Sequence, residues 1–219
     1  MDEIDLERAL NLLIHDLRAP LSVAQGYVRL LTEDRLPSLE ERRRALAQTM
    51  EALGRISRLC DDAAAYIAPR SADPAPPRVV DMRRVIEYVR ESSVATCANR
   101  LSFTVQPDGL RGVFRTANTE RVAQSVAVIL CSIGRAAKGV VDVSVIERDG
   151  EAQFLLGHND DRTALVSRPP EPFNPWRGGH GIALPSACRT VTEAGGRIWT
   201  FAEARGAVGI ALAQEASVQ

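Results

Sequence analysis

Apolar residues recur every three or four positions near the start of the chain. The run consists of Leu10, Leu13, Leu17, Leu21, Ala24, Val28 and Leu31. This spacing places them on one face of an amphipathic helix, which we expect to extend from Ile4 to about Thr32. The sequence predicts a break before Pro37, because proline disfavours the helical conformation at the preceding residue.

A second run of the same kind follows the break. Ser38 and Glu41 have the spacing of a capping box that starts a helix. The expected helix carries Leu39, Leu46, Met50, Leu53, Ile56, Leu59, Ala63 and Ile67. A hairpin of two such helices cannot cover its apolar seam alone, whereas two hairpins form a four-helix bundle. The sequence therefore predicts a homodimer.

A proline-rich stretch then divides the chain. Residues 69–77 are typical of an extended, semi-rigid linker, which separates a helical domain at 1–68 from a second domain at 78–219. In the second domain we expect helices at 82–98 (capped by Asp81), 120–137 (capped by Thr119) and 182–194. The expected strands are 78–80, 101–105, 112–115, 140–148, 152–156, 197–201 and 207–212, with a polar loop over 157–179. This order of elements predicts an α+β sandwich.

The composition limits the class of partner and the location. A net charge of −1 gives no reason to expect binding to nucleic acid or to an anionic membrane. No run of about 18 apolar residues is present, so no transmembrane helix is expected. The acidic N-terminus is unlike a signal peptide. We expect a cytoplasmic protein, either stand-alone or shortened, without a sensor region of its own.

The cysteines show no pattern of a metal site or a disulfide framework. Cys60, Cys97, Cys131 and Cys188 are scattered along the chain, without the paired spacing that zinc sites have. We therefore expect four buried free thiols in a reducing compartment and no metal ion.

One histidine interrupts the first apolar run. His15 is two residues from both Leu13 and Leu17, so at about 100° per residue it points roughly 200° away from the apolar face. Asp16 is its neighbour in sequence, and Pro20 removes a backbone donor one turn later. The sequence thus predicts an outward imidazole that another protein can reach. The alternative is a surface histidine without a function.

Residues 15–21 read His-Asp-Leu-Arg-Ala-Pro-Leu, which resembles the H-box of two-component sensor histidine kinases. The resemblance implies that His15 carries a phosphoryl group and that Asp16 helps to activate the ring, and Arg18 is our candidate to steer the phosphate. It also implies a dimeric phosphotransfer hairpin that binds receiver domains of response regulators. Ala19 stands where family members that dephosphorylate their partner have Thr or Asn, so that activity is not expected here.

The second domain resembles the ATP-binding domain of the same kinases. Residues 171–173 are similar to the F-box, residues 179–184 (Gly-His-Gly-Ile-Ala-Leu) to the glycine-rich G2 segment, and residues 195–199 to the segment that follows it. The resemblance implies nucleotide-binding roles for Gly179 and Gly181. The alternative is that these glycines only start and stop a helix.

The sequence departs from the family where ATP chemistry is needed. Val128 and Ser132 stand in place of the two N-box asparagines, and valine offers no oxygen to Mg²⁺. The G1 box has lost its glycines, so that only Asp160 or Asp161 could supply its carboxylate. Ala183 replaces the third glycine of G2. We therefore predict that ATP binding is lost and that no cofactor is needed.

Three hypotheses about function follow. The first is a histidine phosphotransfer protein of a phosphorelay, in which His15 exchanges a phosphoryl group with receiver aspartates. The second is an active histidine kinase with a divergent ATP site, which would require ATP and Mg²⁺. The third is a pseudokinase scaffold that binds its partners without phosphate chemistry.

Overall fold

The structure is a computed structural model that describes residues 3–67, 78–97, 100–106, 110, 112–135, 139–176, 181–202 and 206–214. The chain forms two compact units, residues 1–69 with 181–183 and residues 70–180 with 184–219, and we describe each by itself. The predicted linker at 69–77 lies outside the described residues. In the described part of the chain, no helix has the length and apolar character that crossing a membrane requires.

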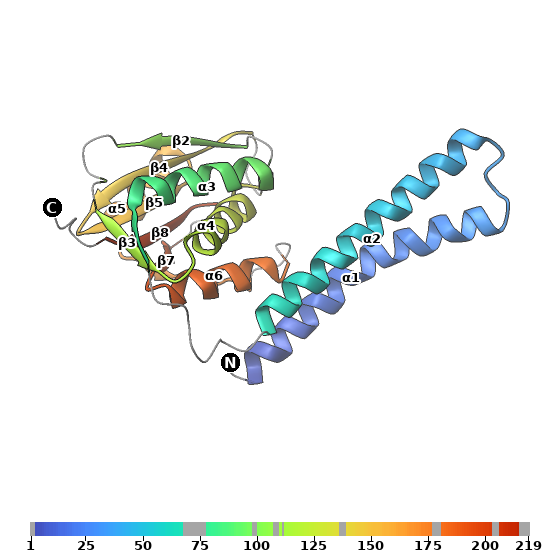
Figure 1. The fold of residues 1–219 in the computed structure, drawn as a ribbon, viewed down its shortest axis with the longest axis horizontal. Helices are drawn as coiled ribbons and strands as arrows, with labels where there is room; N and C mark the ends of the chain where they lie inside the picture. Colours follow the sequence, from blue (N-terminus) through green and yellow to red (C-terminus); the bar gives the residue numbers. More distant parts are fainter. Residues whose placement is uncertain are drawn as a thin grey trace. The chain divides into compact units, whose positions relative to one another are not determined.

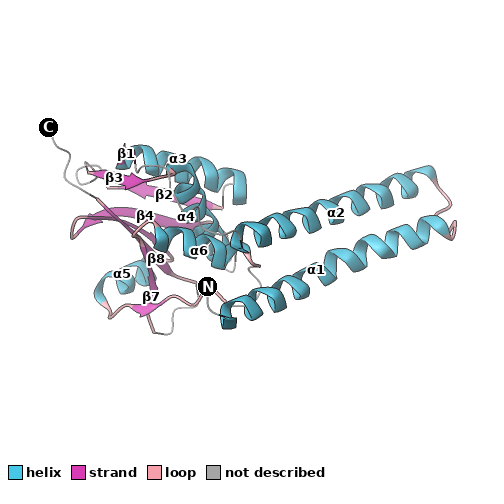
Figure 2. Cartoon of the chain, turned by 60° about the horizontal axis from the view of Figure 1, so that its bottom comes forward, coloured by secondary structure: helices cyan, strands magenta, loops and turns pink. Residues whose placement is uncertain are grey.

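The first unit is a hairpin of two antiparallel helices (Figures 1 and 2). Helix α1 covers Glu3–Thr32 and α2 covers Leu39–Ile67, which confirms both predicted helices. The capping box is present. The Ser38 Oγ donates to Glu41 Oε2 at 2.8 Å and accepts from the Glu41 N–H at 3.1 Å, and the Ser38 N–H donates to the same Oε2 at 3.0 Å. These bonds fix the start of α2 from local sequence alone.

The apolar residues of the hairpin fall into a buried set and an exposed set. The buried set is mostly small and includes Ala9, Pro20 and Ala24 of α1 and Ala45, Ala52 and Ala63 of α2, together with the polar Thr49. Nine large side chains remain 45–68% exposed. We call them the exposed seam, and they are Leu10, Ile14, Leu21 and Val28 of α1 and Leu39, Leu46, Met50, Leu53 and Ile67 of α2.

The second unit, which we call the α/β domain, contains a mixed sheet with helices on both faces (Figure 2). Its sheet has the order β2-β4-β5-β8-β7-β6, and β2 runs parallel to β4 while the other neighbours are antiparallel. Two further strands, β1 and β3, form a small antiparallel sheet. The elements are β1 (Arg78–Asp81), α3 (Met82–Cys97), β2 (Leu101–Val105), β3 (Val113–Thr116), α4 (Thr119–Gly134), β4 (Val141–Arg148), β5 (Glu151–Leu156), α5 (Asn159–Ser167), β6 (Glu171–Pro172), α6 (Ala183–Glu193), β7 (Arg197–Thr200) and β8 (Val208–Ala213). The predicted α+β sandwich is confirmed.

Side chains that alternate along the strands build two cores. Phe154 and Leu156 of β5 belong to the large core with α3, α4 and α6, whereas Leu155 belongs to a smaller core with α5. Because successive strand residues point to opposite faces, α5 covers the face of the sheet opposite α4. The small core also contains Ala164, Leu165, Trp199, Phe201, Ala207 and Ala211.

Three expectations about this domain are wrong in detail. The polar loop predicted over 157–179 contains α5, because Ala164 and Leu165 find buried partners on the sheet. The N-cap of α4 is Asn118 rather than Thr119, since the Asn118 Oδ1 accepts from the Arg121 N–H at 2.9 Å. Helix α4 also ends at Gly134, before the predicted residue 137.

The prediction of four buried free thiols is also wrong. Cys97 and Cys131 form a disulfide, since α3 and α4 lie side by side although the two residues are 34 positions apart in sequence. Cys60 is free but exposed on α2. Only Cys188 is a buried free thiol, and its burial raises its pKa to about 12.

Gly209 of β8 lies directly beneath the indole of Trp199. A Cβ at Gly209 would overlap Cε2, Cζ2 and Cδ2 of that ring. The ring is held in place because its Nε1–H donates to the Leu165 carbonyl at 3.1 Å. We expect Gly209→Ala to lower the free energy of unfolding of the α/β domain by about 2–3 kcal/mol, as overpacking of a core does. Urea titration followed by tryptophan fluorescence measures this loss.

Gly206→Ala is the matched control for Gly209→Ala, since nothing lies within 4 Å of a Cβ added at Gly206. We expect it to change the unfolding free energy by less than about 0.5 kcal/mol. Equal stability of the two variants would contradict the packing of Trp199 against Gly209.

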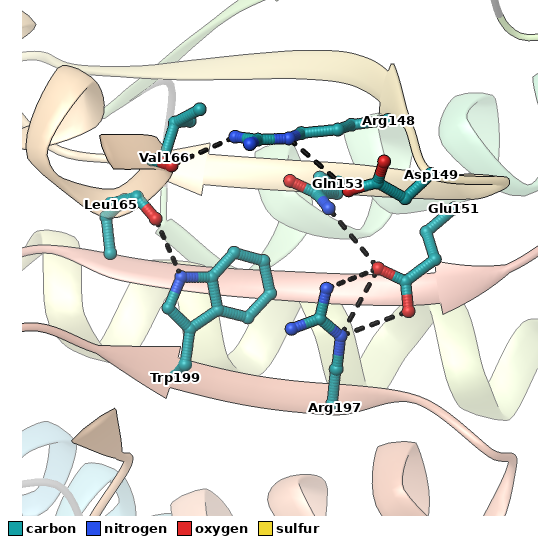
Figure 3. A network of polar contacts seen from close by, with 8 residues as sticks. All are labelled: Arg148, Asp149, Glu151, Gln153, Leu165, Val166, Arg197 and Trp199. Atoms are coloured by element: carbon teal, nitrogen blue, oxygen red, sulfur yellow. Dashed lines mark hydrogen bonds and ion pairs between the residues drawn. The ribbon is translucent and has the colours of Figure 1, made fainter. Parts of the chain in front are cut away.

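An ion pair crosses the outer face of the sheet over β8 (Figure 3). The Arg197 Nε donates to Glu151 Oε1 at 3.0 Å, its Nη2 donates to Oε2 at 2.5 Å, and its guanidinium stacks 4.8 Å from the Trp199 ring centroid. Hydrogen bonding to Arg197 lowers the pKa of Glu151 below its ordinary value of 4.5. The pair joins β5 to β7 without contributing to either core.

The lowered pKa of Glu151 predicts a pH-dependent contribution to stability. A carboxyl with a lowered pKa in the folded state stabilises above its unfolded pKa, and this stabilisation is lost as the pH falls through the folded value. We expect Glu151→Gln to cost about 0.5–1 kcal/mol at pH 7, because the pair is partly exposed. This difference from wild type should disappear well below pH 4.5. Urea titrations across this pH range test it, with the exposed Glu147→Gln as control.

Candidate functional site

His15 lies on the outside of α1, and its side chain is 82% exposed. This confirms the outward imidazole predicted from the apolar pattern. The His15 Nδ1 is 3.1 Å from Asp16 Oδ1. Since a carboxylate only accepts hydrogen bonds, this contact favours a hydrogen on Nδ1 and leaves the lone pair of Nε2 free. The arrangement presents a nucleophilic ring nitrogen to solvent.

The residues that follow His15 supply the rest of the site. Arg18 is exposed three positions later, so both side chains lie on neighbouring turns of one helix face. Ala19 and Ser22 are exposed on the same side, and neither can supply a carboxylate or an amide. Pro20 has no N–H to donate to the Asp16 carbonyl, yet α1 continues through it to Thr32.

The two positions of helix α4 that correspond to the N-box asparagines are Val128 and Ser132. Val128 is half-buried and packs against the large core, and Ser132 is buried. Four residues apart, they occupy one face of the helix, where they offer one hydroxyl and no amide or carboxylate oxygen. Mg²⁺ requires several oxygen ligands in a regular octahedral arrangement. These two residues do not fit the ion.

The candidate G1 carboxylates lie on a different layer of the domain. Asp160 and Asp161 are in the first turn of α5, whose buried residues pack on the face of the sheet opposite α4. A Cβ at Gly157 would lie 2.9 Å from the Asp161 Cβ, so Asp161 packs against the end of β5. The loss of ATP binding stays a prediction. Elsewhere in the described part of the chain, no three His, Cys, Asp or Glu side chains are placed to hold a metal ion.

The glycines at the ends of α6 have backbone roles. Gly181 and Gly195 have φ values of 69° and 79°, which favour glycine. The Gly195 N–H donates to the Thr192 carbonyl at 3.0 Å and the Gly196 N–H to the Val191 carbonyl at 2.9 Å, which ends α6. Gly179 lies outside the described residues. The nucleotide-binding roles of Gly179 and Gly181 stay predictions.

Comparisons with known proteins agree with the sequence resemblance. The family model of the His Kinase A (phospho-acceptor) domain matches residues 5–65. Among curated proteins, no sequence matches the chain.

Solved structures of histidine kinases share the fold. The Acinetobacter baumannii histidine kinase AdeS is 14% identical with a TM-score of 0.55, and the match covers 92% of this chain and 98% of that one. Histidine kinase ThkA, in complex with the response regulator protein TrrA, is 15% identical with a TM-score of 0.62, covering 92% and 60% of the two chains. Full-length ShkA, in complex with AMPPNP, is 19% identical with a TM-score of 0.54, covering 96% and 47%.

Proposed function

We propose that the chain, whose residues 5–65 match the family model of the His Kinase A (phospho-acceptor) domain, is a histidine phosphotransfer protein of two-component signalling. In this proposal, His15 accepts a phosphoryl group from the aspartate of one receiver domain and passes it to another. The observation that carries the proposal is the exposed His15 ring, whose Nδ1 is paired with Asp16 at 3.1 Å.

The geometry of His15 suits attack on an aspartyl phosphate. The Nε2 lone pair forms the N–P bond, the P–O bond to the receiver aspartate breaks, and the aspartate leaves as a carboxylate. The ring becomes positively charged in this step, and Asp16 stabilises that charge while it holds the Nδ1–H. The Arg18 guanidinium orients the phosphoryl oxygens. In the return step, the aspartate of a second receiver attacks phosphorus and the Nε2–P bond breaks.

Two observations favour transfer over autophosphorylation. Val128 and Ser132 do not supply Mg²⁺ ligands, and Asp160 and Asp161 belong to a helix on the opposite face of the sheet. A receiver brings its own Mg²⁺ and acidic pocket, so transfer needs neither group from this chain. The response regulator bound to ThkA supports a receiver as partner, docked on the surface around His15 that includes Leu12, Ala19, Ser22 and Val23.

A second copy of the chain would cover the exposed seam. Within each helix, residues of the seam directly follow buried ones: Leu10 follows Ala9, Leu21 follows Pro20, Leu46 follows Ala45, Met50 follows Thr49 and Leu53 follows Ala52. One step along a helix is a rotation of about 100°, and in an antiparallel pair this rotation leads to the same side of the hairpin. The seam is therefore one continuous apolar face, and two hairpins that pair these faces form a four-helix bundle.

Labelled phosphate distinguishes the three hypotheses. The full chain is incubated first with labelled ATP and millimolar Mg²⁺, and then with receiver domains of the same genome that have been phosphorylated by labelled acetyl phosphate. We expect no label from ATP and transfer to His15 from at least one receiver. Label from ATP would support an active kinase instead. Receiver binding without transfer would support a scaffold.

A further inference from the structure

Two links join the C-terminal end of α3 to α4. Cys97, the last residue of α3, is bonded to Cys131 of α4, and their Cα atoms are 5.7 Å apart, a separation usual for disulfides. The Arg135 Nη2 also donates to the Thr96 carbonyl at 3.3 Å. The two cysteines are 7% and 1% exposed, so the bond is buried between α3 and α4.

The same site also accommodates the two thiols. The Ser93 carbonyl oxygen is 3.2 Å from the Cys97 Sγ and 3.7 Å from the Cys131 Sγ. A thiol S–H is a weak hydrogen-bond donor, so this oxygen is a partner for the thiols after the bond opens. Ser93 is itself fixed, since its Oγ donates to the Val89 carbonyl at 2.7 Å. The Ser93 carbonyl is thus in place to accept from the thiols when the disulfide opens.

We propose that Cys97 and Cys131 are a reversible redox couple that clips α3 to α4 and sets the stability of the α/β domain. In the closing reaction, one thiolate attacks a low-molecular-weight disulfide such as oxidised glutathione and releases one thiol. The second thiolate then displaces the other glutathione from the mixed disulfide. The two cysteines lose two electrons and two protons, and one oxidised glutathione becomes two reduced ones. A dithiol reverses the reaction.

The pairing is specific to these two residues. Cys60 belongs to the hairpin unit, and both Cys60 and Cys188 are free, whereas Cys97 and Cys131 are bonded to each other. A crosslink between residues 34 positions apart restricts the unfolded chain. For a domain of this size, the closed form should unfold about 5–10 °C above the open form.

The test uses the full wild-type chain, so that no variant has to fold. One sample is equilibrated with oxidised glutathione and another with dithiothreitol, and free thiols are then blocked under denaturing conditions for peptide mass spectrometry. We expect a linked 97–131 peptide only in the oxidised sample, and four blocked thiols in the reduced sample. The thermal unfolding midpoint of the α/β domain should fall by about 5–10 °C on reduction. A different linked pair, or equal midpoints, would overturn the proposal.

Two variants test whether the Cys97–Cys131 disulfide causes the change in the thermal unfolding midpoint. In Cys97→Ala, the midpoint should no longer respond to dithiothreitol and should equal that of the reduced wild type to within about 3 °C. The matched control, Cys60→Ser with Cys188→Ala, keeps the linked peptide and the response to dithiothreitol. A response that persists in Cys97→Ala would place the redox effect elsewhere and contradict the proposal.

Discussion

The His15→Gln variant is expected to accept no label from a phosphorylated receiver, a loss of at least about 10³-fold in the rate of transfer. Glutamine keeps a polar side chain of similar length but has no ring nitrogen that can form an N–P bond. Because His15 is 82% exposed, the substitution leaves no cavity and should not disturb α1. The measurement is the rate at which label leaves the receiver and appears on the chain as acid-labile phosphate.

Two further variants separate the role of the ring from that of its neighbour. His158→Gln is the matched control, since His158 is also exposed but belongs to the α/β domain. This variant should transfer phosphate at the wild-type rate. Asp16→Asn keeps a hydrogen-bond acceptor beside Nδ1 but removes the negative charge, so the rate should fall by about 10–10²-fold without stopping. Full transfer by His15→Gln would refute the proposed site, whereas loss in His158→Gln would move it to the α/β domain.

The hairpin could be predicted from the sequence because its determinants are local. The three-and-four spacing of apolar residues, the Ser38–Glu41 box and Pro37 all act within a few residues of each other, and the structure reproduces the helices they predict. The position of His15 on the outer face followed from the same periodicity. The periodicity did not show which apolar residues pack between the two helices and which remain exposed.

The buried and exposed apolar residues of the hairpin differ in side-chain size, which the sequence shows directly. The buried positions carry small residues such as Ala9, Ala45 and Ala52, which allow two helices to approach closely, while the large side chains follow one position later. A sequence reading by size as well as polarity would have separated the two sets. It would also have placed Cys60, seven residues after Leu53, on the exposed side.

The features of the α/β domain that the sequence did not predict depend on contacts between residues that are far apart in sequence. Helix α5 is short and has little apolar periodicity, and Leu165 is buried only because Trp199 and Leu155 lie against it on the sheet. The disulfide between Cys97 and Cys131 depends on the packing of α3 against α4. No local pattern encodes either contact, so propensity and spacing could not reveal them.

The second large effect is expected at the exposed seam, in the double variant Leu21→Asp with Leu46→Asp. Both residues are exposed in the single chain, at 47% and 54%, so the hairpin itself should stay helical. In the proposed dimer each leucine is buried twice by symmetry, and each burial contributes about 1.5–3 kcal/mol. We expect the dimer dissociation constant to rise by at least about 10³-fold. Sedimentation equilibrium across a concentration series measures it, and circular dichroism checks the helices.

A matched pair of substitutions distinguishes the seam from general surface effects. Val23 is 44% exposed, two residues from Leu21, and Gln48 is exposed two residues from Leu46, but neither belongs to the seam. Val23→Asp with Gln48→Asp should therefore leave the dimer intact. Cys60 gives an independent readout, because maleimide should label it more slowly in the dimer than in the seam variant. A wild type that remains monomeric at about 100 μM, or a seam variant that remains dimeric, would mean that a different partner covers this face.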